Sequence, residues 1–172
     1  LGGSDPYSSS KASAELIIKS YCESFFKNRN SNIRVAAARA GNVIGGGDWA
    51  DDRIVPDCIK SWSKNEKVII RNPYSTRPWQ HVLEPLGGYL TLACQLAQTS
   101  KLTGESFNFG PDSRNSYTVK DLVNELSKGF PNSKWVVKQN KNCIKEANLL
   151  SLNCNKAKKQ LMWKPKLNFI NT

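Results

Sequence analysis

Amphipathic helical patterns alternate with short apolar runs along this chain, and this alternation constrains its fold more than any other feature. Asp5 can cap a helix, and Pro6 suits the first turn of that helix. Apolar residues then recur at three- and four-residue steps and predict one buried helical face, made of Ala14, Ile17, Ile18, Tyr21, Cys22 and Phe25. The run that follows, residues 33–39 (IRVAAAR), fits a strand that is buried on both faces.

The middle of the chain repeats this order. Pro56 is expected to open a short helix that carries Ile59 and Trp62, and residues 67–71 and 106–110 read as strands. A long helix that begins at Glu84 and Pro85 is predicted to have an inner face of Leu86, Tyr89, Leu90, Ala93, Leu96 and Ala97. Such an order of elements is typical of an α/β protein.

A smaller unit is expected from about Ser113 onward. Thr118 and Asp121 have the spacing of a capping box, and Gly129 supplies a stop for the helix. The apolar stripe of this helix is predicted to be Val119, Leu122, Val123 and Leu126. Residues 134–138 are a strand candidate, and residues 155–161 a short helix.

Composition excludes several classes of protein. The 172 residues are 39% hydrophobic and 23% charged, which is typical of a globular chain. No apolar run approaches the ~18 residues of a membrane span, and no secretory leader opens the sequence. The net charge of +11 would suit a polyanionic partner, but the lysines are scattered without interleaved aromatics, so a solvated lysine-rich face is favoured over nucleic-acid binding.

The cysteines and the histidine give no metal or redox motif. Five cysteines are present in no CxxC pattern, and His81 is the single histidine. We therefore expect no metal site, reduced thiols that pack as small hydrophobes, and a cytoplasmic location.

Tyr7 and Lys11 carry the clearest chemical signal. A separation of four residues places both on one helical face. A free tyrosine has a pKa near ~10, and a neighbouring ammonium group favours the phenolate. Such a pair can move a proton to or from a substrate hydroxyl, although a YxxxK spacing alone also occurs on ordinary helix surfaces.

The order of motifs around this pair is more specific. Pro-Tyr-Ser-x-Ser-Lys is followed by a small-residue helix, a buried strand that ends at Arg39, and then Gly41-Asn42-Val43-x-Gly45. This order resembles the extended short-chain dehydrogenase/reductase family of nucleotide-sugar enzymes. The segments GGGDW and RPWQHVLEPL are similar to those of the family's 4,6-dehydratases that act on CDP-glucose. The resemblance covers nearly the whole chain and implies a partial Rossmann-like parallel sheet with a smaller C-terminal substrate-binding α/β region.

The resemblance also implies roles for individual residues. Tyr7 would take the proton from the sugar 4-hydroxyl while NAD takes the hydride, and Lys11 would bind the nicotinamide ribose. Substrate would be bound by Asn42, Arg53, Arg71 and Arg77, with Arg77 on the diphosphate. The product would be a 4-keto-6-deoxy sugar nucleotide, and family members commonly form homodimers through the helix that carries the YxxxK pair.

Each of these residues also has a purely structural interpretation. Asn42 could adopt a left-handed turn conformation, and Arg53 and Arg71 could be surface charges or ion-pair partners. For Arg77 we favour function, because the following Pro-Trp fixes its loop. Trp49 and Trp79 are expected to pack in the interior, and His81 to be structural.

The sequence also departs from the family pattern. It contains no glycine-rich dinucleotide fingerprint, and nothing before Tyr7 supplies the family's groups for the C5/C6 elimination. We therefore expect an internal fragment that is marginally stable and inactive alone, with an exposed sheet edge. Its predicted domains are residues 1–44, the end of an NAD-binding domain, and residues 45–172, mainly substrate-binding, with 79–110 returning to the first domain.

Three alternatives stay open. Within the same family, the chain could be a 4-epimerase or a GDP-sugar dehydratase. In a different class, it could be a basic module that binds polyanions with steep salt dependence. It could also be a non-catalytic remnant that only associates with homologous subunits.

Overall fold

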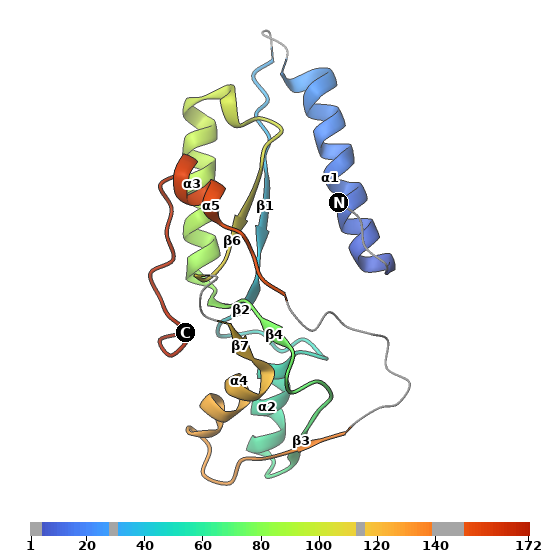
Figure 1. Ribbon diagram of the computed structural model, residues 1–172, viewed down its shortest axis with the longest axis vertical. Coiled ribbons are helices and arrows are strands. Elements are labelled where there is room, and N and C mark those ends of the chain that lie inside the picture. The colour runs from blue at the N-terminus through green and yellow to red at the C-terminus, as the bar shows by residue number, and fades with distance from the viewer. Residues whose placement is uncertain (1–4, 28–30, 113–115, 139–149) are drawn as a thin grey trace. The chain divides into compact units, whose positions relative to one another are not determined.

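The computed structural model describes residues 5–27, 31–112, 116–138 and 150–172. In chain order, the elements are α1 (Pro6–Tyr21), the π-helical turn η1 (Cys22–Phe26), β1 (Ala37–Ala40), β2 (Asn42–Ile44), α2 (Ile54–Ser63), β3 (Lys67–Ile70), β4 (Thr76–Arg77), β5 (Trp79–His81), α3 (Leu83–Gln98), the 3₁₀ turn η2 (Ser100–Leu102), β6 (Ser106–Phe109), β7 (Tyr117–Thr118), α4 (Val119–Ser127), β8 (Lys134–Val137) and α5 (Asn155–Gln160) (Figure 1). Strands β1–β6, β2–β5 and β3–β8 pair in parallel, and β4–β7 pair antiparallel. The predicted α/β class is confirmed.

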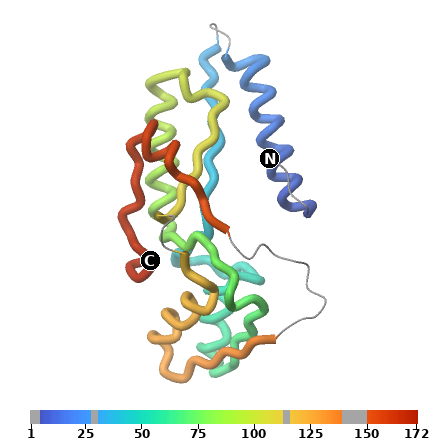
Figure 2. Tube along the Cα trace, viewed as in Figure 1, coloured from blue at the N-terminus to red at the C-terminus, as the bar shows by residue number. Residues whose placement is uncertain are grey.

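The chain divides into two compact units. The first unit consists of residues 1–40, 85–109 and 154–164, and the second of residues 41–84, 110–153 and 165–172. Figure 2 traces the chain by colour, and three separate stretches make up each unit. These units are defined by compactness alone, so the domain bounds predicted from the sequence (1–44 and 45–172, with 79–110 returning) stay a prediction.

Two phenylalanines of β6 form the centre of the first unit. Phe107 and Phe109 are fully buried, and Tyr89 and Trp163 both meet the Phe109 ring edge-on, with ring centroids 5.5 and 5.1 Å away. Strand β6 pairs with β1 from Ala37↔Ser106 to Ala40↔Phe109. The predicted strand at residues 106–110 is thus confirmed. Its buried rings form the core against which α3, through Tyr89, and the C-terminal segment, through Trp163, pack.

Helix α3 buries a different face from the predicted one. Its buried residues are Glu84, Pro85, Gly88 and Leu92, whereas the predicted inner residues Leu86 and Leu90 are 46% and 69% exposed. At Gly88, an added Cβ would lie 2.2 Å from Cδ1 of Phe109. Because Gly88 has no side chain, the Phe109 ring can approach the helix backbone. This close approach turns the Gly88 face of α3 toward the core, and not the face that carries Leu86 and Leu90.

Helix α1 begins as predicted. Asp5 is its N-cap, Pro6 stands in the first turn, and the Asp5 side chain accepts hydrogen bonds from the Ser8 N–H (2.9 Å) and the Ser8 hydroxyl (2.6 Å). These contacts satisfy donors that the first helical turn would otherwise leave free.

The predicted buried face of this helix is wrong for most of its members. Cys22 is buried, but Ile17, Tyr21 and Phe25 are 58%, 54% and 61% exposed. Periodicity identifies the apolar stripe of a helix, but it does not say whether the same chain covers that stripe.

The strand expected at residues 33–39 is shorter and less buried than predicted. Strand β1 covers Ala37–Ala40, its residues are half-buried or exposed, and Ile33 is 54% exposed. Within the described part of the chain, β1 pairs only with β6, so one strand edge has no partner. Burial on both faces would need covering layers that these residues do not provide.

The core of the second unit lies between α2, β3 and α4. It contains Cys58, Trp62, Val68, Ile70 and Val123, and the Trp62 indole donates a hydrogen bond to the Lys134 carbonyl at 3.0 Å. The strand predictions at residues 67–71 and 134–138 are confirmed, with β3 and β8 paired from Lys67↔Lys134 to Ile70↔Val137. Helix α2 begins at Ile54, slightly before the expected Pro56.

Helix α4 follows its predicted pattern closely. The capping box forms between Thr118 and Asp121 in both directions, and Leu122 and Val123 are buried. The short helix predicted at residues 155–161 is present as α5. Local capping and periodicity were sufficient here because both signals agree with the packing.

The thiols agree in part with the prediction. Cys22, Cys58, Cys94 and Cys154 are free, and all but Cys94 are buried, while Cys143 lies outside the described residues. Burial raises the pKa of the Cys58 thiol to about 12, as expected for a packing residue. In the part of the chain that was searched, no group of acidic, histidine or cysteine side chains could hold a metal ion. None of the described helices is long and apolar enough to cross a membrane.

Candidate functional site

Tyr7 and Lys11 lie together near the start of α1. The Nζ atom of Lys11 is 5.6 Å from the centroid of the Tyr7 ring, and the Tyr7 side chain is 71% exposed. The N-cap at Asp5 and the rigid φ of Pro6 fix the backbone immediately before Tyr7. The first unit therefore presents a phenol and an ammonium group side by side on an accessible helical turn.

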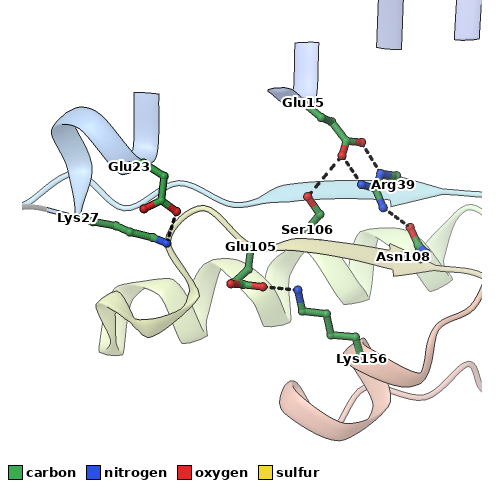
Figure 3. A network of polar contacts seen from close by, with 8 residues as sticks. All are labelled: Glu15, Glu23, Lys27, Arg39, Glu105, Ser106, Asn108 and Lys156. Carbon is green, nitrogen blue, oxygen red and sulfur yellow. Dashed lines mark hydrogen bonds and ion pairs between the residues drawn. The ribbon is translucent and has the colours of Figure 1, made fainter. Parts of the chain in front are cut away.

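A polar network attaches this helix to both strands of the first unit (Figure 3). Glu15 lies one helical turn beyond Lys11, and its two carboxylate oxygens accept hydrogen bonds from Nε and Nη2 of Arg39 on β1. Arg39 Nη1 also donates to Oδ1 of Asn108 on β6 at 2.9 Å, and the Ser106 hydroxyl donates to Glu15 at 3.4 Å. The network ties the helix that carries Tyr7 to the sheet.

The electrostatics of this network follow from its geometry. The hydrogen bond from Arg39 holds the pKa of the Glu15 carboxyl below its ordinary value, and burial opposes this shift. The same contact raises the pKa of the Arg39 guanidinium. Both groups thus stay charged near neutral pH, and the bidentate pair fixes the helix more precisely than one hydrogen bond would.

Sequence reasoning did not single out Glu15 and noted Arg39 only as the end of a strand. The two residues are separated by 24 positions, so no local pattern links them. A glutamate one turn beyond a candidate lysine was the available signal, but its partner becomes visible only in the tertiary structure.

In the second unit, the backbones of Asn42 and the RPW segment lie next to each other. Strand β2 pairs with β5 so that Asn42 is opposite Trp79. An added Cβ at Gly41 would lie 2.6 Å from the Pro78 carbonyl oxygen, so this close approach requires glycine. Asn42 lies in a strand and is absent from the described residues with positive φ, so the left-handed turn is not its conformation.

Arg77 is half-buried at the end of the short strand β4. Its Nη1 donates to the Thr76 carbonyl oxygen at 2.9 Å. Arg77 also lines a small cavity of about 10 Å³, together with Thr76, Pro78, Pro111, Asp112, Ser116, Leu150, Ser151 and Leu152. The Arg77 side chain is therefore positioned by a hydrogen bond and by the walls of this cavity.

Arg53 and Arg71 occupy more exposed positions. Arg53 is the N-cap residue of α2 and makes no side-chain capping bond, and Arg71 pairs with Asp52 at 3.1 Å with 59% of its side chain exposed. An open groove of about 540 Å³ runs past Arg71 between α2 and β3. Its walls carry both signs of charge, from Lys60, Lys64, Lys67, Arg71 and Lys138 and from Asp52, Asp57 and Glu66. This groove is not a uniformly positive surface.

The remaining aromatic and histidine predictions are partly correct. Trp79 is 7% exposed, as packing requires, although its indole N–H has no hydrogen-bond partner among the described residues. Trp49 is 59% exposed, so the prediction that it packs in the interior is wrong. His81 Nδ1 accepts a hydrogen bond from the Leu83 N–H at 3.2 Å, which fits a structural role at the start of α3.

Parallel strands joined through a helix, with Tyr-x-x-x-Lys opening a neighbouring helix, define an α/β chain of the extended short-chain dehydrogenase/reductase type. The family model described as GDP-mannose 4,6 dehydratase matches residues 1–172, and the chain belongs to this family. The family is thus one of nucleotide-sugar dehydratases and epimerases, as the sequence resemblance predicted.

One relative matches the whole chain in sequence. CDP-glucose 4,6-dehydratase of Salmonella typhimurium (strain LT2) is 44% identical over 176 residues, which cover 100% of this chain and 49% of the relative. The chain therefore spans about half the length of that enzyme. The narrower resemblance, to CDP-glucose 4,6-dehydratase, is confirmed as a similarity.

Solved structures agree on the fold. A dTDP-glucose 4,6-dehydratase from Bacillus anthracis, crystallised in complex with NAD, matches 99% of this chain and 50% of its own length, with a TM-score of 0.76 and 22% identity. A UDP-glucuronic acid 4-epimerase from Bacillus cereus, in complex with UDP-glucuronic acid and NAD, matches 95% of this chain and 48% of its own length, with a TM-score of 0.77 and 19% identity. The partial Rossmann-like fold is thereby confirmed.

Proposed function

We propose that this chain is part of an NAD-dependent lyase that converts CDP-glucose to CDP-4-keto-6-deoxyglucose. The observation that carries the proposal is the 44% identity over the whole chain to a CDP-glucose 4,6-dehydratase. The paired Tyr7 and Lys11 on an exposed helical turn support it independently, because they offer the proton-transfer group that such a reaction needs.

In this proposal, Tyr7 is the catalytic base. Its phenolate oxygen accepts the proton of the sugar 4-hydroxyl as the hydride leaves C4, which produces a ketone. The Lys11 ammonium stabilises the phenolate and donates hydrogen bonds to ribose hydroxyls. The ketone then acidifies the C5 proton, and loss of that proton together with the C6 hydroxyl gives water.

The residues present fit only one end of the proposed cofactor. Tyr7 and Lys11 would hold the nicotinamide ribose, whereas the sequence has no glycine-rich phosphate-binding fingerprint. When bound, NAD would supply the hydride chemistry of the reaction, as the acceptor at C4 and the donor at C6, and a proton equivalent to the one taken from the 4-hydroxyl would be added at C5.

Arg77 is the proposed ligand of the substrate diphosphate. Its guanidinium can donate to oxygens of both phosphates, and its half-buried position on β4 limits its motion. Asn42 is proposed to bind near the same phosphates, because β2 runs beside the segment that follows Arg77. Arg53 and Arg71 are proposed contacts for the nucleotide end, with Arg71 leaving Asp52 to do so.

A chimera tests this proposal in a complete enzyme. This chain replaces the matched 176 residues of the Salmonella typhimurium enzyme, and formation of the keto sugar is measured with CDP-glucose, GDP-mannose, dTDP-glucose and UDP-glucuronic acid. We expect turnover of CDP-glucose alone. Preferred turnover of GDP-mannose, or epimerisation in place of dehydration, would assign the chain to a different branch of the family.

Substitutions in the chimera test the residue roles. Tyr7→Phe should lower kcat by about 10²–10⁴-fold, because it removes the group that transfers the proton. Tyr21→Phe, on the same helix and 54% exposed, is the matched control and should leave kcat unchanged. Equal rates for the two variants would remove Tyr7 from the mechanism.

The proposal also includes a homodimer in the cytoplasm. Leu16, Ile17, Tyr21 and Phe25 of the α1–η1 segment are all more than half exposed, and an apolar helical surface of this kind suits a second copy of the chain. The free thiols of Cys22, Cys58, Cys94 and Cys154 fit a reducing compartment.

A further inference from the structure

The segment from Pro165 to Thr172, here called the strap, is attached at its start to a buried carboxylate. Glu84 is only 8% exposed, and its Oε1 accepts hydrogen bonds from the backbone N–H groups of Lys166 (2.9 Å) and Leu167 (2.7 Å). Glu84 lies in the first turn of α3, seven residues after Arg77. The contact therefore joins the strap to residues 77–84, the stretch that begins with Arg77.

A second contact joins the strap to β7. The Phe169 ring stacks face to face on the Tyr117 ring, with centroids 3.9 Å apart and 10° between the planes. Tyr117 belongs to β7, where it is the direct antiparallel neighbour of Arg77 on β4. The strap therefore supports the strand against which the backbone of Arg77 is hydrogen-bonded.

The β4–β7 ribbon needs such support. Each strand has only two residues, and an isolated two-stranded ribbon is at best marginally stable. Two backbone hydrogen bonds extend the ribbon, from Val119 N–H to the Ser75 carbonyl (3.0 Å) and from Lys120 N–H to the Pro73 carbonyl (2.8 Å). A guanidinium that must meet oxygens of two phosphates has to be placed to within about 0.5 Å.

We infer that the strap positions Arg77 for a diphosphate-bearing ligand, with Phe169 as the positioning residue and Glu84 as its anchor. This inference rests on the proposed function, in which Arg77 binds the substrate diphosphate. Phe169 would act through Tyr117, on which its ring stacks, and Tyr117 pairs with Arg77 across the β4–β7 ribbon.

Binding of CDP to the chimera of this chain with the Salmonella typhimurium enzyme tests the inference by isothermal titration calorimetry. Phe169→Ala should weaken binding of CDP about three- to tenfold, the value of one aromatic pair. Phe169→Tyr should restore it, because the ring and its stacking remain. Ile170→Ala, at an exposed neighbouring position of the strap, is the matched control and should bind CDP like the unmodified chain.

A double-mutant cycle separates positioning from general destabilisation. In the Arg77→Ala background, Phe169→Ala should weaken CDP binding no further, because the residue that the strap positions is gone. An equal loss in both backgrounds, or no loss from Phe169→Ala while Arg77→Ala weakens binding, would overturn the inference.

Hydrogen exchange distinguishes failure of the inference from failure of the proposed function. Phe169→Ala should speed exchange of the β4 and β7 amides, and Ile170→Ala should not. If CDP fails to bind, or binds equally well to Arg77→Ala, the proposed role of Arg77 fails. In that case, the exchange rates of the β4 and β7 amides still test whether the strap stabilises β4. Unchanged rates in Phe169→Ala would show that it does not.

Discussion

Replacing Glu15 by Gln removes one charge from the network that ties α1 to β1 and β6. In the native chain, the carboxylate accepts two hydrogen bonds from Arg39 and a longer one from Ser106. A glutamine amide keeps the shape but offers one oxygen, and it turns an NH₂ group toward the guanidinium. Arg39 then keeps the glutamine oxygen and Asn108 as acceptors, but it loses the second carboxylate oxygen and the negative charge.

The expected loss in free energy of unfolding is about 1–2 kcal/mol. A hydrogen bond to a charged group contributes about 1.5–3 kcal/mol, and this range is reduced here because solvent screens a partly exposed pair. Exposure of the Arg39 side chain is 39% and that of Glu15 is 20%, which is intermediate between a surface and a buried pair. For a chain of this length, the loss corresponds to about 2–8 °C in Tm.

The pH dependence follows from the direction of the pKa shift. The Glu15 pKa is lowered in the folded chain, so its stabilising contribution is fully present above the ordinary glutamate value and is lost as the pH falls through the folded pKa. The difference in free energy of unfolding between the native chain and Glu15→Gln should therefore be constant near pH 7. It should decrease toward zero as the pH falls below about 4.3.

Urea denaturation followed by circular dichroism, repeated from pH 7 to pH 3.5, measures this difference. Glu23→Gln is the matched control, because Glu23 pairs with Lys27 at 2.6 Å on the same helical segment but 51% of its side chain is exposed. A pair this exposed is screened by solvent, so Glu23→Gln should destabilise the chain less than Glu15→Gln. If Glu15→Gln destabilises the chain no more than Glu23→Gln, the network does not fix α1 as argued.

Two further predictions concern packing and assembly. Gly88→Ala should lower the free energy of unfolding by about 1–3 kcal/mol in urea denaturation, because the new Cβ would collide with Phe109. The control Gly87→Ala places its Cβ where nothing lies within 4 Å, so it should be neutral or stabilising by up to ~1 kcal/mol. Equal effects of the two substitutions would contradict the described packing of α3. Ile17→Lys should abolish self-association in sedimentation velocity while Lys19→Ala leaves it intact, and a dimer that survives Ile17→Lys would place the interface elsewhere.

Local signals predicted much of the secondary structure. The Asp5 cap, the Thr118–Asp121 capping box and the strands at 67–71 and 106–110 were all correct, because each depends on neighbours in sequence. The positions of Tyr7 and Lys11 on one helical turn follow from the same local geometry.

Burial was harder to predict. The apolar stripes of α1 and α3 are real, yet Ile17 and Leu90 are exposed and the α3 core contact uses Gly88. A hydrophobic stripe shows that a helix can bury one face, but the identity of the covering layer depends on segments far away in the sequence. The same reason explains why Trp49 was wrongly expected to pack in the interior.

The sequence by itself determined the α/β class, the family and the pair of residues proposed for proton transfer, because these follow from short-range spacing and from motifs that can be compared directly. Only the tertiary structure decided that Glu15 binds Arg39 and that Glu84 and Phe169 hold the strap beside the strand of Arg77. These contacts join residues separated by 24 to 83 positions, and the Phe169–Tyr117 stack, at 52 positions, lies within that range. At such separations, the folded backbone rather than chain connectivity brings the side chains together.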